Sequence, residues 1–160
     1  MKKYLKAYSF LLSISISLVI LDQWTKTLVR ANLAITESWM PLEWLAPYAR
    51  VVNWHNTGAA FGIFQGNNGI FIALAFVIIG LIFMYFPTIP ETDFYFRLAL
   101  SLQVAGAAGN LIDRLIRGSV TDFISVGKFP VFNVADSCIT MGVVVLLLGM
   151  WVEERKFRDE

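Results

Sequence analysis

Several residue types are scarce in this 160-residue chain, and their scarcity narrows its chemistry. Cys138 is the only cysteine, so an internal disulfide is excluded. His55 is the only histidine, so a Ser-His-Asp triad would depend on that one residue, which lies in an aromatic segment. No cluster of histidine, cysteine and carboxylate residues has metal-ligand spacing, and we therefore expect no metal site.

Charge is scarce as well. Charged residues make up 16% of the chain and hydrophobic residues 57%, whereas soluble domains carry about 25% charged residues. The mean hydropathy is +0.63. The composition therefore indicates an integral membrane protein, and the length predicts a single domain over residues 1–160. A net charge of +1 gives no support for a nucleic-acid partner.

Four apolar stretches approach the roughly 20 residues that a membrane-spanning helix needs. We expect an all-α membrane fold with four transmembrane helices, at about 8–27, 69–86, 94–112 and 131–151, of which the third is the least apolar. The first stretch follows a basic start, as a signal peptide does, but no small-residue cleavage site follows it. We interpret it as a retained span.

Basic residues predict the orientation in the membrane. Lys2, Lys3 and Lys6 place the N-terminus in the cytoplasm by the positive-inside rule, and four spans return the C-terminus to the same side. Other basic residues then lie on the outer side and need a local reason there, such as a structural partner or a lipid headgroup. They are Arg30, Arg50, Arg114, Arg117 and Lys128.

The outside loops are predicted at about 28–68 and 113–130. The first is long and rich in tryptophan and tyrosine, which favour the membrane–water interface. Its segment ARVVNW has the composition of a strand, and NTGAAFGIF is short and amphipathic. We therefore predict a small extracytoplasmic β element and an interfacial helix.

Polar side chains gather at the outer ends of these spans. Ionisable residues in membrane spans are rare and usually functional. Asn133 and Asp136 share a helix face at the start of the fourth span, and the loop before them can bring Asp122 close. Two close carboxylates share a proton near neutral pH. One can activate water while the other protonates a carbonyl oxygen, which hydrolyses a peptide bond without a covalent intermediate.

Other interpretations of these residues stay open. Asp22 and Lys26 have the spacing of a helical ion pair, Asp113 the position of a helix cap, and Asn56 that of a turn residue. Asn110 has the character of an interhelical hydrogen-bonding residue. A proton relay through Asp22, Asp122 and Asp136 is an alternative function, but the inner halves of the spans look almost purely apolar.

Five sequence blocks carry a resemblance to a known family. LDQWTK, NTGAAF, GNLIDR, VTDFI and FNVADS occur in that order. Together they resemble the lipoprotein signal peptidases, the bacterial signal peptidase II enzymes. The resemblance implies a membrane aspartyl endopeptidase with four spans. It would remove the signal peptide from diacylglyceryl-modified prolipoproteins, cutting just before the lipidated cysteine. The GxGD signature of presenilin-type proteases, another alternative, is absent.

The resemblance also implies residue roles. Asp122 and Asp136 match the catalytic aspartates, and Asp22 and Lys26 match the pair that supports the site. The residues matching the site lining are Asn56, Asn110, Asp113, Arg114, Asn133 and Ala135. No cofactor or metal is implied. We expect a monomer in the bacterial cytoplasmic membrane with both termini cytoplasmic, an active site near the outer leaflet, and lipid-modified prolipoproteins and membrane lipids as partners.

Overall fold

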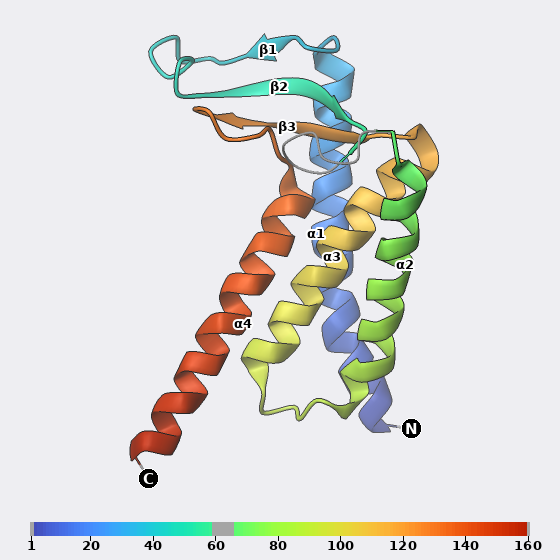
Figure 1. The fold of residues 1–160 in the computed structure, drawn as a ribbon, viewed down its shortest axis with the longest axis vertical. Helices are drawn as coiled ribbons and strands as arrows, with labels where there is room; N and C mark the ends of the chain where they lie inside the picture. The colour runs from blue at the N-terminus through green and yellow to red at the C-terminus, as the bar shows by residue number, and fades with distance from the viewer. Residues whose placement is uncertain (1, 59–65, 160) are drawn as a thin grey trace.

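The computed structural model describes residues 2–58 and 66–159 (Figure 1). Long helices form most of the molecule, and a small sheet lies across one end of them. The first turn of α1 and the last turn of α4 lie at the opposite end. The helices are α1 (Lys2–Asn32), α2 (Asn68–Tyr85), α3 (Phe94–Arg117) and α4 (Val134–Asp159), with a short 3-10 helix η2 (Phe86–Thr88) after α2.

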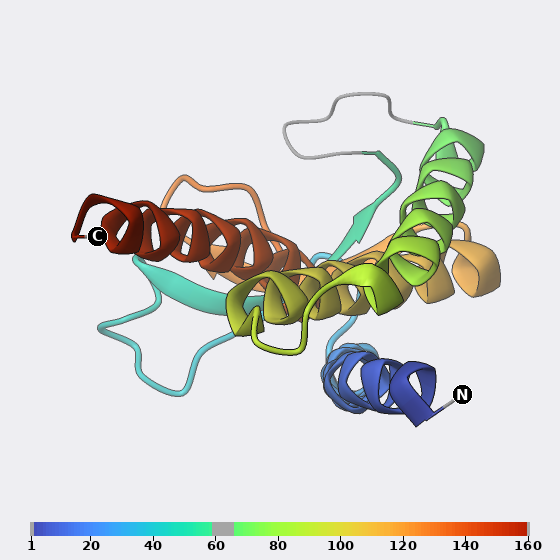
Figure 2. The ribbon, with the colours of Figure 1, turned by 90° about the horizontal axis from the view of Figure 1, so that it is seen from below.

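Helix α3 is the centre of the packing, since it contacts α1, α2 and α4. Seen end-on in Figure 2, the ribbons of α2 and α4 lie well apart from each other. Two glycines of α3 allow the close approach of its neighbours. A Cβ at Gly106 would lie 2.4 Å from the carbonyl oxygen of Ala135, and one at Gly109 would lie 2.6 Å from Asp22 Oδ2. The small residues of the run AGAAG therefore bring three helices together at one level.

The sheet has three antiparallel strands in the order β1 (Ser38–Trp39), β2 (Ala49–Asn56) and β3 (Val120–Val126). Gly118, in a left-handed conformation with φ of 75°, ends α3 and turns the chain into β3. Asn56 pairs with Val120 across the strands, so it lies on the same face as Asp122 two residues further along β3. The predicted small β element is confirmed, and it includes a strand that we had assigned to the loop 113–130.

The helices differ from the predicted spans at their ends. Helix α1 extends beyond both ends of 8–27, so the outside loop 28–68 begins later than predicted. Helix α3 runs past 112 to Arg117, and α4 begins at Val134 rather than at 131. Residue Phe132 instead pairs with Ile124 of β3 in an isolated bridge. The interfacial helix predicted from NTGAAFGIF falls largely on 59–65, outside the described residues.

Three of the described helices are long and apolar enough to cross a membrane: Leu5–Asn32, Asn68–Thr88 and Val134–Arg155. Helix α3 is not among them, because it carries several charged residues. One of these, Arg97, is buried against the rings of Phe10 and Phe86. The half of the bundle away from the sheet is therefore less purely apolar than we expected. Its buried hydroxyls of Ser15 and Ser101 donate hydrogen bonds to main-chain carbonyls.

Candidate active site

Asn133 and Asp136 begin α4 with a reciprocal pair of hydrogen bonds. The main-chain N–H of Asp136 donates to Asn133 Oδ1 over 2.9 Å, and the main-chain N–H of Asn133 donates to Asp136 Oδ2 over 3.1 Å. This is the geometry of a capping box, which satisfies otherwise unpaired donors at a helix start. The sequence NVAD thus fixes both side chains rigidly at the end of α4 nearest the sheet.

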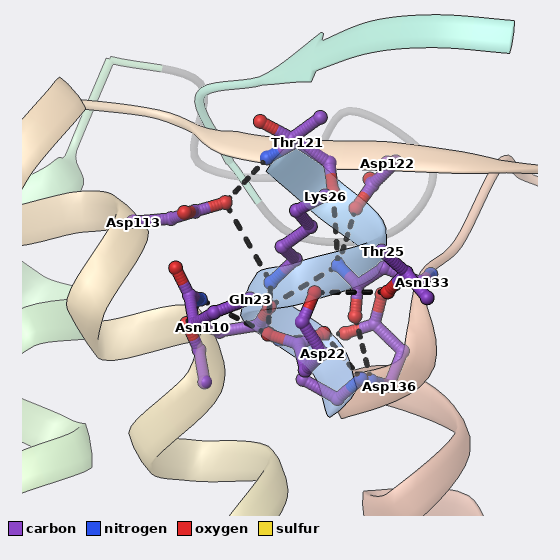
Figure 3. Close-up of polar contacts among 12 residues, drawn as sticks. Asp22, Gln23, Thr25, Lys26, Asn110, Asp113, Thr121, Asp122, Asn133 and Asp136 are labelled. Atoms are coloured by element: carbon purple, nitrogen blue, oxygen red, sulfur yellow. Dashed lines mark hydrogen bonds and ion pairs between the residues drawn. The ribbon is translucent and has the colours of Figure 1, made fainter. Parts of the chain in front are cut away.

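Asp122 is held on β3 by two amides from different elements (Figure 3 shows its contact with Asn133). Asn133 Nδ2 donates to Asp122 Oδ1 over 2.7 Å, and Asn56 Nδ2 donates to Asp122 Oδ2 over 2.9 Å. The residue is only 1% exposed. Asn56 Oδ1 also accepts from the main chain of Gly58, so this asparagine supports the turn after β2 as well as the carboxyl.

The aspartate pair, Asp122 and Asp136, is joined through amides. Asn133 contacts both carboxyls, and Asn110 Nδ2 donates to Asp136 Oδ1 over 2.8 Å. Asn133 Nδ2 lies 3.1 Å from Asn110 Oδ1, which closes the network. Between the two carboxyls themselves, the described part of the chain contains no direct hydrogen bond. The structure thus brings both aspartates into one amide network that leaves each carboxyl with unused oxygen lone pairs.

Burial and charge repulsion act together on Asp122. They raise its pKa from 3.8 to about 7, with burial as the larger cause and the neighbouring charge of Asp136 as the second. The hydrogen bonds from Asn56 and Asn133 and the charge of Lys26 oppose this shift. A carboxyl with this pKa can hold or release a proton near neutral pH.

A buried cation lies beneath the aspartate pair. Lys26 is fully buried, with Nζ 2.8 Å from Asp22 Oδ2 and 3.0 Å from Asn110 Oδ1. The other oxygen of Asp22 accepts the main-chain N–H of Ala135 over 2.9 Å. The pair Asp22 and Lys26 therefore ties α1 to the start of α4, and it connects a positive charge to Asp136 through one amide.

Asp113 connects α1, α3 and β3. Its Oδ2 accepts the main-chain N–H of Thr121 over 2.9 Å and lies 3.6 Å from Lys26 Nζ. Its Oδ1 lies 3.5 Å from Arg30 Nη1. Asp113 therefore fixes the start of the strand that carries Asp122, rather than capping its own helix.

Sequence reasoning missed three residues of this region: Gln23, Arg30 and Thr121. Gln23 Nε2 donates to Asp22 and to the carbonyl of Gly109, and Arg30 contacts Asp113 and Thr121. Arg30 was visible in the sequence as a basic residue on the outer side without a partner. Gln23 and Thr121 belong to blocks already noted, but nothing in their spacing predicts these contacts.

A cavity of about 630 Å³ opens beside the aspartate pair. Both aspartates line it, together with Asn56, Asn110 and Arg114. Arg114 donates to the carbonyl of Gly58 over 3.2 Å and lies 4.8 Å from the ring of Phe71. The remaining wall is mainly apolar and comes from α2, α4 and the segment after β3; it includes Leu74, Ile78, Phe129, Phe132, Ile139 and Met141.

Two other groups were considered. His55 is exposed on β2, and among the described residues it does not line the cavity. No group of three or more histidine, cysteine and acidic residues within 2–58 and 66–159 is arranged to hold a metal ion. The chemistry available in the cavity is therefore that of paired carboxyls, amides and one arginine.

Comparison with known proteins places these residues in a family context. The family model described as "Signal peptidase (SPase) II" matches residues 14–152. Proteins named lipoprotein signal peptidase are similar over most of the chain. The one from Halalkalibacterium halodurans is 41% identical, covering 92% of this chain and 95% of that protein. The one from Staphylococcus carnosus is 36% identical, covering 92% and 94%.

Solved structures share the fold. A bacterial membrane enzyme determined by the in meso method aligns with a TM-score of 0.82 and 30% identity, covering 90% of this chain and 88% of that chain. A second structure with the same kind of description aligns with a TM-score of 0.77 and 31% identity, covering 88% and 91%. The arrangement of helices and sheet is thus that of known bacterial membrane enzymes.

Proposed function

Because this chain belongs to the signal peptidase II family and removes signal peptides from prolipoproteins, we propose that Asp122 and Asp136 hydrolyse the scissile peptide bond. The observation that carries this assignment is their position. Both carboxyls lie in one amide network on the wall of one cavity, and the pKa of Asp122 is raised to about 7. The remaining titratable groups of the cavity wall lack a comparable partner for acid–base work.

One proton shared by the aspartate pair is sufficient for the reaction. The ionised carboxyl removes a proton from water, whose oxygen attacks the carbonyl carbon of the scissile bond. The protonated carboxyl donates its proton to the carbonyl oxygen, which gives a neutral tetrahedral intermediate. When that intermediate collapses, the C–N bond breaks and a carboxyl returns a proton to the leaving amine. Which aspartate is the first base is not assigned, because a coupled pair titrates as a unit.

The surrounding amides orient the pair without neutralising it. Asn133, Asn110 and Asn56 supply N–H donors that hold each carboxyl in place. A direct ion pair would lower the proton affinity of a carboxyl strongly, whereas an amide does so weakly. Lys26 is 3.0 Å from Asn110 and therefore acts on Asp136 through that amide. Asp22, Asp113 and Lys26 are in this proposal supporting residues, while Arg114 and Ala135 line the site.

The cavity suits a peptide that carries lipid. Ligand sites of 300–1,000 Å³ are the usual range, and the apolar wall from α2 and α4 offers a surface for acyl chains. We propose that the substrate is a prolipoprotein whose cysteine already carries diacylglycerol, and that cleavage occurs just before this cysteine. The lipid would anchor the substrate so that the scissile bond lies at the level of the aspartate pair.

The proposed setting is the bacterial cytoplasmic membrane, with four spans forming one domain over 1–160. Three helices have the hydropathy of spans. We include α3 as the fourth, because contacts with α1, α2 and α4 leave it little surface for lipid. Both termini would be cytoplasmic, and the sheet and the aspartate pair would lie at the outer leaflet. The protein would act as a monomer.

The direct test uses purified enzyme with a diacylated prolipoprotein and an unlipidated control, read by mobility shift. Wild type should cleave only the diacylated substrate. Asp122→Asn and Asp136→Asn should each lose activity by about 10²–10⁴-fold, the usual contribution of general acid–base catalysis. Asparagine keeps an acceptor oxygen for the capping box at 136, so folding should be retained. Activity near the wild-type level in Asp136→Asn would refute the mechanism, and cleavage of both substrates would refute lipid dependence.

A further inference from the structure

Arg30 joins α1 to the strand that carries Asp122. Its Nη1 donates to Thr121 Oγ1 over 3.0 Å and lies 3.5 Å from Asp113 Oδ1. Its Nη2 donates to Thr27 Oγ1 over 2.9 Å, and Thr27 in turn donates to the carbonyl of Gln23. The guanidinium is therefore fixed from its own helix, and its side chain is only 14% exposed.

Thr121 is the residue on which these contacts converge. It is 1% exposed and directly precedes Asp122. Asp113 holds its main-chain N–H, Arg30 holds its hydroxyl, and Asn133 Nδ2 lies 3.5 Å from its carbonyl oxygen. A shift of Thr121 would carry the main chain of Asp122 with it. Because Asp136 is fixed separately by the start of α4, such a shift changes the separation of the two carboxyls.

Arg30 also completes a charge balance. The carboxylates of Asp22 and Asp113 face two cations, Lys26 and Arg30. Without Arg30, both carboxylates would compete for Lys26, which also donates to Asn110. Breaking one partner from a buried ionic network leaves an uncompensated charge. Arg30 thus leaves Lys26 free to serve the amide that holds Asp136.

We propose that Arg30 is a positioning residue for peptide-bond hydrolysis, acting through Thr121 and Asp113 to hold Asp122 in register with Asp136. The inference rests on the proposed role of the aspartate pair. It also accounts for a basic residue placed against the positive-inside expectation: the charge has a structural partner at the site, and it is retained for catalysis rather than for orientation.

The test compares Arg30→Gln, Arg30→Lys, Thr121→Val and the Arg30→Gln/Thr121→Val double variant, with Asp122→Asn alongside. We expect kcat of Arg30→Gln to fall by about 10-fold, because small misplacements of catalytic groups are costly, with KM changed by less than about twofold. Arg30→Lys should recover part of this loss. Thr121→Val keeps its main-chain contacts, and it should lower kcat similarly. The double variant should be no worse than either single variant, since both remove one interaction.

Arg50→Gln is the matched control, because Arg50 is an exposed arginine of β2, and it should keep wild-type kcat. Thermal unfolding of each purified variant separates positioning from folding. The proposal is overturned if Arg30→Gln and Thr121→Val keep wild-type kcat while Asp122→Asn is inactive, or if their effects are fully additive. It is equally overturned if losses follow thermal stability alone without recovery in Arg30→Lys. Activity in Asp122→Asn would overturn both this inference and the assignment of the aspartate pair.

Discussion

The amides around the aspartate pair set how tightly it holds its proton. Burial favours the neutral form of Asp122, while Asn56 and Asn133 donate to its oxygens and favour the charged form. In the folded protein the pKa of this carboxyl is about 7, compared with 3.8 in its ordinary range. The folded chain thus keeps a proton that the unfolded chain releases at lower pH. The stability contributed by the neutral carboxyl is present at acidic pH and is lost as pH rises towards 7.

Activity should follow the same proton. The mechanism needs one proton in the pair, so the cleavage rate should fall as pH rises through about 7, where Asp122 loses its proton. Asn56→Ala removes a donor that favours the ionised carboxyl, which should raise the pKa of Asp122 further and move the alkaline limb to higher pH. The measurement is kcat against pH for both proteins.

Glu43→Gln provides the control for this pH profile, since Glu43 is exposed and lies between β1 and β2. It should leave the alkaline limb where the wild type has it. A limb that moves to lower pH in Asn56→Ala would contradict the assignment of the limb to Asp122.

At the scale of elements, the packing of α3 against α1 and α4 depends on glycine. A methyl group at Gly109 would lie 2.6 Å from Asp22 Oδ2 and 3.0 Å from the Cβ of Ala135. Alanine is the better helix former by about 1 kcal/mol, but overpacking costs about 1–3 kcal/mol. Gly109→Ala should therefore lower the thermal midpoint and reduce cleavage by at least about 10-fold, because the ion pair of Asp22 and Lys26 must move.

Gly80→Ala is the matched substitution, because nothing lies within 4 Å of a Cβ placed at Gly80 in the middle of α2. It should keep full activity and gain up to about 1 kcal/mol of stability. If Gly109→Ala behaved like Gly80→Ala, the close approach at Gly109 would not be needed for the site.

The sequence predicted the helices well, since long apolar runs are a strong signal. It failed for β3 because this strand is buried on both faces for most of its length and so lacks an alternating pattern. The order of motifs predicted which residues meet in the site. It did not predict how they meet: that Asp22 accepts from Ala135, or Asp113 from Thr121, depends on contacts between distant segments. No local spacing encodes them.

At the scale of the whole molecule, polar chemistry and chain termini lie at opposite ends. The sheet and the aspartate pair lie at one end of the helices, whereas the first turn of α1 and the last turn of α4 lie at the other (Figure 1). In a membrane this separation places the aspartate pair and the termini on different sides. The basic start of the chain then predicts that the aspartate pair is on the outer side.

Cysteine labelling tests this orientation. In a Cys138→Ala background, which removes the only native thiol from a buried position, single cysteines replace Glu43 beside the sheet or Glu153 near the end of α4; both glutamates are exposed. In sealed right-side-out vesicles, an impermeant maleimide should label Glu43→Cys but not Glu153→Cys, and detergent should make both react. Inside-out vesicles should reverse the pattern. Labelling of Glu153→Cys from the outside would invert the orientation, and the aspartate pair would then face the cytoplasm, where a translocated lipoprotein precursor cannot reach it.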